Sequence, residues 1–104
     1  MEKLVAYKRM PVWNKDTMPE AVQRKHNTKV GTWGKITVVK GTLKFIELTE
    51  DGVVIAEHLF EAGADNPMAQ PQAWHRVEAV TEDVEWYLEF YCKAEDYFHK
   101  KYNS

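Results

Sequence analysis

The sequence is poor in the residues that enzymes most often use as nucleophiles. It has one cysteine, Cys92, and one serine, Ser104, in 104 residues. A single cysteine excludes an internal disulfide and a metal cage built from several thiolates. A lone serine at the terminus excludes a Ser-His-Asp arrangement. Any chemistry in this chain therefore has to use histidine, carboxylates or backbone groups, and no catalytic residue can be named from the sequence.

Clustered glycines and long apolar runs are also missing. The five glycines stand apart, at positions 31, 34, 41, 52 and 63, so none forms a phosphate loop or the turn that binds a dinucleotide or adenosyl-methionine. The apolar run Val53–Ala56 is far shorter than the ~18 residues that a bilayer span needs. The start, Met1–Leu4, lacks the apolar stretch of a secretory signal. We therefore expect a cytoplasmic protein that does not enter a membrane.

Neither sign of charge dominates. Fourteen Lys and Arg stand against sixteen Asp and Glu, for a formal net charge of −2. This balance removes the general electrostatic argument for a nucleic-acid partner. Residues 1–50 carry an excess of basic side chains and residues 51–104 an excess of acidic ones. Because β-rich folds interleave distant segments, we interpret this asymmetry as a mixed solvated surface.

Strand-forming residues are abundant, and their pattern predicts antiparallel sheets. In Val84–Cys92 every second residue is apolar, which is the period of a strand with one buried face, so Cys92 is expected to be an inert core thiol. Glu50-Asp51-Gly52 has the composition of a hairpin turn. The short connection 81–83 predicts that the strands on either side of it pair with each other.

The strand candidates are short and evenly spaced, with no βαβ alternation. Together they predict one domain over residues 1–104 built from about seven antiparallel strands, closed or in two sheets. We expect residues 33–60 to form a meander and residues 93–102 a short terminal helix. The expected strands are Leu4–Arg9, Ala21–His26, Trp33–Lys40, Thr42–Thr49, Val53–Phe60, Ala73–Val80 and Val84–Cys92.

Two of the four histidines are placed where a site could form. His26 ends one expected strand and His75 begins another, and the ends of strands are where a barrel has its mouth. His26 and His75 could therefore supply part of a metal site, which needs three or four ligands. The alternative is two unrelated, half-buried histidines that form hydrogen bonds with loop carbonyls. The sequence leaves both interpretations open.

Spacing alone does not identify which residues would join these histidines in a metal or ligand site. Glu78 lies three residues after His75, which puts it on the opposite face of a strand, while Glu47 and Glu89 have suitable chemistry without a known place. Trp33 and Trp74 flank the histidine-bearing loops and could line a ligand pocket, although tryptophans more often pack in a core. Arg76 and the indole N–H groups are suitable hydrogen-bond donors for an oxyanion.

Five blocks of the sequence carry a resemblance to a known family: Met10–Lys15, Lys25–Lys35, Gly41–Phe45, Gln72–Ala79 and Phe90–Phe98. They resemble the N-terminal module of the TehB tellurite-resistance proteins. More distantly, the chain is similar to small stand-alone YeaR-like proteins, which share the Trp-Asn-Lys, His, Gly and Trp-His positions.

The resemblance implies a cupin-like double-stranded β-helix, an antiparallel jelly-roll barrel. Gly41 then resembles the turn glycine of the first cupin motif, and His26 its surviving histidine. The segment from Gly63 through the proline loop, Asp65–Pro71, to His75 is similar to the second motif. The second histidine of the first motif is absent, and Gly34 stands where its glutamate would be expected.

In longer proteins of this family, the module precedes a methyltransferase domain that uses adenosyl-methionine to detoxify tellurite. That domain is not in these residues, so we do not expect the chain to be an enzyme by itself, and residues 93–102 would connect the two domains. Our first hypothesis is a cytoplasmic binding module that holds a small molecule, an oxyanion or a divalent transition metal near His26 and His75. The second is a metal-dependent enzyme using these histidines and one carboxylate. The third is an assembly module that forms a homodimer through an edge strand at Leu4–Arg9.

Overall fold

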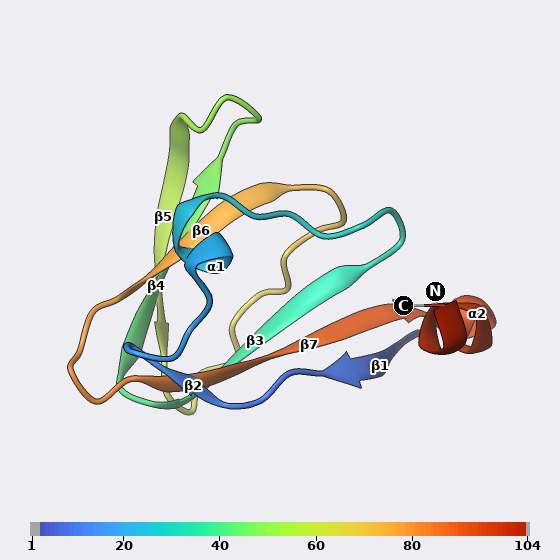
Figure 1. Cartoon of the computed structure of the whole chain (residues 1–104), viewed down its shortest axis with the longest axis horizontal. Coiled ribbons are helices and arrows are strands. Elements are labelled where there is room, and N and C mark those ends of the chain that lie inside the picture. The colour runs from blue at the N-terminus through green and yellow to red at the C-terminus, as the bar shows by residue number, and fades with distance from the viewer. Residues whose placement is uncertain (1–2, 104) are drawn as a thin grey trace.

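Two antiparallel sheets form the two layers of the molecule. The computed structural model describes residues 3–103 (Figure 1). In the first sheet, β7 pairs with β3 along one edge and with β1 and then β2 along the other; in the second, β4 lies between β5 and β6. The all-β, jelly-roll-like fold expected from the sequence is therefore confirmed. The elements are β1 (Leu4–Arg9), β2 (Trp13–Asn14), α1 (Glu20–Arg24), β3 (Trp33–Lys40), β4 (Thr42–Leu48), β5 (Val54–Glu61), β6 (Trp74–Ala79), β7 (Glu85–Lys93), η1 (Ala94–Asp96) and α2 (Tyr97–Asn103).

The core lies between the sheets and is built by alternation along the strands. On β7, Trp86 and Leu88 are buried, as the two-residue period predicts. Trp86 meets Trp13 edge to face at 5.2 Å between ring centroids. From the second sheet, Leu43 and Phe60 enter the same core. Both sheets therefore turn an apolar face inward. The outer face of the second sheet is not wholly polar, because Ile55 and Leu59 of β5 are exposed there.

Short connections cross between the sheets, which corrects two of our expectations. β4 and β5 form the expected hairpin, but β3 belongs to the other sheet, so residues 33–60 are not a meander. The expected pairing of β6 with β7 is also wrong, because β6 pairs with β4 and β7 with β3. At the first crossing Gly41 has φ +74°, and the Thr42 N–H donates to Thr81 Oγ1 of the second crossing at 3.0 Å. A tight turn sets the direction of the next strand, whereas the need to cover two apolar faces sets which sheet it joins.

The expected strand Ala21–His26 is wrong, because the chain forms the short helix α1 there. Pro19 immediately precedes the helix, where its restricted φ is tolerated. Val22 is the buried residue of the helix, and Met18, which precedes the helix, is buried in the same core. Only His26 keeps β pairing, as an isolated bridge to His75.

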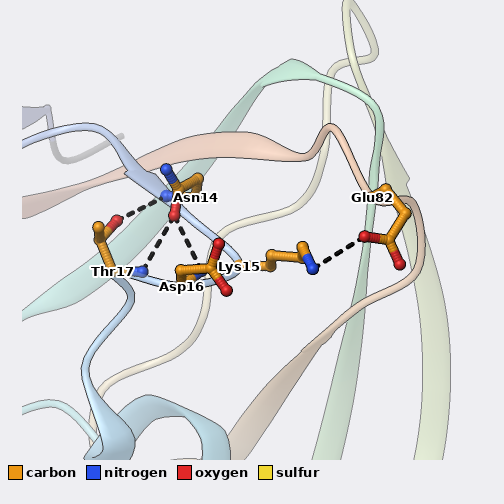
Figure 2. A network of polar contacts seen from close by, with 5 residues as sticks. All are labelled: Asn14, Lys15, Asp16, Thr17 and Glu82. Carbon is orange, nitrogen blue, oxygen red and sulfur yellow. Dashed lines mark hydrogen bonds and ion pairs between the residues drawn. The ribbon is translucent and has the colours of Figure 1, made fainter.

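A polar turn after β2 holds the first layer to the β6–β7 connection (Figure 2). Asn14 Oδ1 accepts hydrogen bonds from the N–H groups of Asp16 and Thr17, at 2.8 and 3.0 Å. The Thr17 hydroxyl in turn accepts from the Asn14 N–H at 2.9 Å. Lys15 Nζ lies 2.8 Å from a Glu82 carboxylate oxygen. These contacts show that the Trp-Asn-Lys block contributes to the architecture of the turn.

The chain ends in η1 and α2, where the sequence predicts a terminal helix. α2 packs beside β1 at one end of the sandwich (Figure 1). Lys100 on this helix donates through Nζ to the Val30 carbonyl at 2.7 Å and contacts Thr32 Oγ1 at 3.2 Å. Across residues 3–103, no helix has both the length and the apolar content needed for a membrane crossing.

Candidate functional site

His26 and His75 lie side by side, although 48 intervening residues separate them in the sequence. Each donates its backbone N–H to the carbonyl of the other at 2.8 Å, so the two residues form a hydrogen-bonded antiparallel pair. The imidazole rings meet nearly edge to face, with centroids 5.4 Å apart and planes at 76°. His26 thus pairs with the edge of β6 that does not face β4, and His75 stands near the start of β6, just after the proline loop.

Burial keeps this pair uncharged at neutral pH. His75 is 7% exposed. Desolvation, with a smaller contribution from neighbouring His26, lowers the pKa of His75 to about 4. Its Nδ1 lies 3.1 Å from the Ala73 carbonyl and donates to it, which leaves the lone pair of the neutral ring on Nε2. Burial also lowers the pKa of His26, whose buried Nε2 has no hydrogen-bond partner among residues 3–103.

The first of two neighbouring clefts, which we call the His75 cleft, opens between β4, β5 and the proline loop and has a volume of about 190 Å³. Glu47 stands opposite His75 in the β4–β6 register, and its carboxylate lies 2.6 Å from Nε2 of His58. The Phe45 ring lies 5.0 Å from the His75 ring and closes the inner wall. The lining residues are Phe45, Glu47, His58, Pro67, Met68, Ala69, Gln70, Ala73, Trp74 and His75.

A second cleft, which we call the His26 cleft, lies on the other side of the pair and has a volume of about 220 Å³. Among the described residues, its lining includes two lysines and several hydrogen-bonding side chains but no carboxylate. His75 does not line this cleft, and His26 does not line the other. The histidine pair is therefore a wall between two clefts. The lining residues are Tyr7, Lys8, His26, Asn27, Thr28, Lys29, Thr32 and Phe90.

The residues expected to bind a ligand are only partly brought together. Trp74 lines the His75 cleft, and Lys25 Nζ lies 4.5 Å from the centroid of its ring. Trp33 is on the face of β3 opposite the core residue Ile36 and lines neither cleft. Arg76 also lines neither cleft, because its guanidinium pairs with Glu78. Roles for Trp33 and Arg76 in ligand binding stay predictions.

The carboxylates considered as further metal ligands lie apart from the histidine pair. Glu78 points away from His75, as the strand period predicts, and its hydrogen bond with Arg76 lowers the pKa of its carboxyl group. Glu89 is on β7, in the other sheet. Glu47 pairs with His58. Within residues 3–103, no group of three or more His, Cys, Asp or Glu side chains is arranged to hold a metal ion.

Cys92 is inaccessible, in agreement with its expected place on the apolar face of β7. The side chain is completely buried, and burial raises the pKa of its thiol. A thiol in this state is a poor nucleophile. Cys92 also lines neither of the two clefts.

Sequence reasoning missed the basic side of the site. Lys8 and Lys29 both line the His26 cleft. Their signal in the sequence is the excess of basic residues in positions 1–50, which we interpreted as an unremarkable mixed surface. The pairing of Glu47 with His58 was also missed, because it depends on the register between β4 and β5.

Comparison with known protein families matches residues 8–88 to the TehB-like domain. The chain belongs to the TehB-like domain family. It is 64% identical over 102 residues to the probable S-adenosyl-L-methionine-dependent methyltransferase TehB of Haemophilus influenzae strain Rd, covering 98% of this chain and 36% of that protein. It is 28% identical over 90 residues to the uncharacterized protein YeaR of Escherichia coli K12, covering 82% of this chain and 75% of YeaR. The chain thus spans about a third of the length of the TehB relatives that it matches.

Two solved structures have the same arrangement. The crystal structure of TehB from Haemophilus influenzae superposes with a TM-score of 0.92 at 64% identity, over 97% of this chain and 35% of that one. An Escherichia coli K12 protein solved by structural genomics gives a TM-score of 0.77 at 26% identity, over 85% of this chain and 89% of that one. The TehB-like fold therefore occurs both as the N-terminal portion of a longer protein and in a protein of nearly its own size.

Proposed function

We propose that this TehB-like domain is a cytoplasmic binding module that holds a small molecule or oxyanion beside His26 and His75 and so supports tellurite resistance. The observation that carries the proposal is the buried, uncharged imidazole pair with a cleft on each side and one nitrogen, Nε2 of His26, that no group in the described part of the chain partners. A buried polar atom without a partner is costly unless something binds it.

Binding, and not catalysis, is the function that these residues support. The thiol of Cys92 is buried, and residues 3–103 contain no cluster of three metal-ligating side chains. Both clefts are near 200 Å³, smaller than the ~300 Å³ at which pockets begin to hold drug-sized ligands. They suit an inorganic ion or a molecule of a few heavy atoms. The methyl transfer named for the Haemophilus relative would be performed by another domain, which is the partner that we propose for this module.

Equilibrium binding of tellurite to the purified chain tests this proposal. Calorimetry is expected to show saturable binding with a stoichiometry of one. In His26→Ala the affinity is expected to fall by at least about tenfold, because a charge-assisted hydrogen bond is removed. The control is Lys40→Ala, which removes a positive charge from a position that lines neither cleft. Tellurite binding that is absent, or equal in all variants, would refute the oxyanion role.

A metal ion at the same pair is the second candidate. It is favoured by one observation, the neutral His75 ring whose Nε2 carries its lone pair beside the unpartnered Nε2 of His26. Elemental analysis after reconstitution with zinc, nickel or iron tests it, with His26→Ala and His75→Ala beside the parent. Stoichiometric metal that is lost in both variants would support this candidate and the cupin-like interpretation, and absence of metal in the parent would exclude it.

Self-association is a separate property that we propose for β1. This strand is at the edge of the first sheet, and its outer edge has no strand partner within residues 3–103. Open edges of this kind pair with other chains. Light scattering over a range of concentrations is expected to show a homodimer. A monomer at every concentration would contradict the proposal.

A further inference from the structure

The His26 cleft has an unbalanced positive charge. Lys8 and Lys29 line it, and no carboxylate of residues 3–103 does. Neither ammonium group forms an ion pair or hydrogen bond with any residue between positions 3 and 103. By contrast, Lys15 and Lys44 are paired with Glu82 and Glu57. Two unpaired cations at one concave surface raise the local concentration of anions.

A β-bulge in β1 aims two consecutive side chains at this cleft. The register with β7 shifts between Ala6 and Lys8, so that one residue, Tyr7, is inserted into the pairing. In a regular strand Tyr7 and Lys8 would point to opposite faces, but the bulge interrupts the alternation, and both line the cleft. The Tyr7 hydroxyl also contacts Thr32 Oγ1 at 3.1 Å, which holds the phenol ring in place.

The wall of the cleft supplies an unused polar atom. Nε2 of His26 is buried and has no hydrogen-bond partner among residues 3–103. The Thr28 hydroxyl lines the same surface, and its one donor hydrogen bond, to the Gln70 carbonyl, is long at 3.4 Å. Two ammonium groups, one imidazole and one hydroxyl are together the donor types that recognise an oxygen-rich anion.

We propose that the His26 cleft binds one small inorganic oxyanion, held by the ammonium groups of Lys8 and Lys29 and by a hydrogen bond from Nε2–H of His26. This proposal deepens the proposed function and rests on it for the biological role, because it assigns the oxyanion to one of the two clefts. The His75 cleft is excluded as the anion site because its charged lining residue is Glu47, whose carboxylate repels anions. A volume of about 220 Å³ admits an oxyanion of a single central atom with its bound water.

Titration of the 15N-labelled chain with sulfate, phosphate or tellurite, followed by NMR, tests the assignment. We expect saturable shifts at Lys8, His26 and Lys29 and little change at Glu47 and His58. In Lys8→Gln/Lys29→Gln, which keeps most of both stems, the affinity is expected to fall by about a hundredfold, roughly tenfold for each charge-assisted contact.

The matched control is Lys35→Gln/Lys40→Gln, which removes the same charge from β3 at positions that line neither cleft. Its affinity is expected to stay within about threefold of the parent, because remote surface charges are screened by salt. Equal weakening in both double variants would show a nonspecific field effect and overturn the assignment. Shifts confined to the His75 cleft would overturn it as well.

The two proposals fail in different ways. If tellurite binds the parent but Lys8→Gln/Lys29→Gln binds it equally well, the cleft assignment is wrong and the binding function survives. If sulfate and phosphate bind in the His26 cleft and tellurite does not, the cleft is an oxyanion site while the tellurite role is wrong. If none of the three anions binds at a concentration of about 10 mM, where complexes with a dissociation constant of about 1 mM are largely saturated, the cleft assignment and the oxyanion role are both wrong.

Discussion

The two clefts share a wall but differ in charge and in what lies behind them. The His26 cleft has two lysines and no carboxylate, whereas the His75 cleft has Glu47 and no lysine or arginine. Behind the His75 cleft lies the stacked pair Phe45 and Phe60, both buried, with ring centroids 5.0 Å apart. The aromatic side chains of the His26 cleft, Tyr7 and Phe90, are only partly buried. The comparison teaches that two histidines brought together by backbone pairing need not serve one ligand.

The largest difference is expected in how much the aromatic side chains beside each cleft contribute to the free energy of unfolding. Phe45→Ala, behind the His75 cleft, is expected to lower the free energy of unfolding by about 3–5 kcal/mol, because it leaves a cavity beside Phe60. Phe90→Ala is expected to cost about half as much, since its side chain is only partly buried. Urea unfolding monitored by circular dichroism measures both values. Equal losses would show that the two clefts are backed equally well.

Acid is expected to destabilise the protein because it protonates His75, which is buried and uncharged in the native state. The unfolded chain protonates His75 near pH 6.5, but the native state does so only near pH 4, so the unfolded state binds more protons between these values. The free energy of unfolding therefore falls as pH falls through this window, by up to about 3 kcal/mol for His75.

His75→Gln, which cannot take the proton, is the comparison for this pH dependence. Both proteins are unfolded in urea at several values between pH 7 and pH 4, and the parent is expected to lose more stability over that range. Because carboxylates and His26 titrate in both proteins, the difference isolates His75. Parallel curves would mean that His75 is not desolvated in the native state.

A smaller effect is expected at the contact that holds the outer wall of the His26 cleft. Lys100→Met keeps most of the stem but removes the donor to the Val30 carbonyl and the contact with Thr32 Oγ1. We expect a loss of about 1 kcal/mol, the usual contribution of such a hydrogen bond. Hydrogen exchange at residues 29–33 is expected to quicken while exchange around Glu47 stays unchanged. Faster exchange in both places would show that the clefts are not independent.

The smallest effect is expected from the ion pair in the His75 cleft. Glu47 and His58 are both more than two-fifths exposed at their side chains, and pairs of this kind contribute little to stability. A double-mutant cycle with Glu47→Gln and His58→Gln is expected to give a coupling energy below about 1 kcal/mol. A larger coupling energy would indicate that these two side chains are shielded from water more than their exposed fractions suggest.

Local patterns predicted the parts of the fold that local physics decides. Val84–Cys92 was predictable because alternation puts one face of a strand in the core, and Glu50-Asp51-Gly52 because glycine tolerates the positive φ of a tight turn, +86° at Gly52. The interpretation of Ala21–His26 as a strand failed because Val22 is the one fully buried residue of the segment, so no alternating apolar face holds it in a sheet.

The candidate site was predictable only in part. The expectation that His26 and His75 could meet is met by the structure, but His26 does so as an isolated bridge after α1 and not at the end of a strand. Spacing could not show that Lys8 joins them, because a bulge reverses the face on which a side chain lies. The period of two, counted from His75, could have shown that Arg76 lies on the opposite face together with Glu78, with which it pairs.

By itself the sequence determined a mainly β chain with a buried thiol, no clustered glycines and a histidine, His75, at the start of a strand. These properties follow from residue type and a period of two, which act over a few residues. Only the tertiary structure decided which strands share a sheet, how the histidine pair divides two clefts, and that two lysines of the first half line one of them. Such properties depend on contacts between distant segments, whose registers are set by burying both sheets at once.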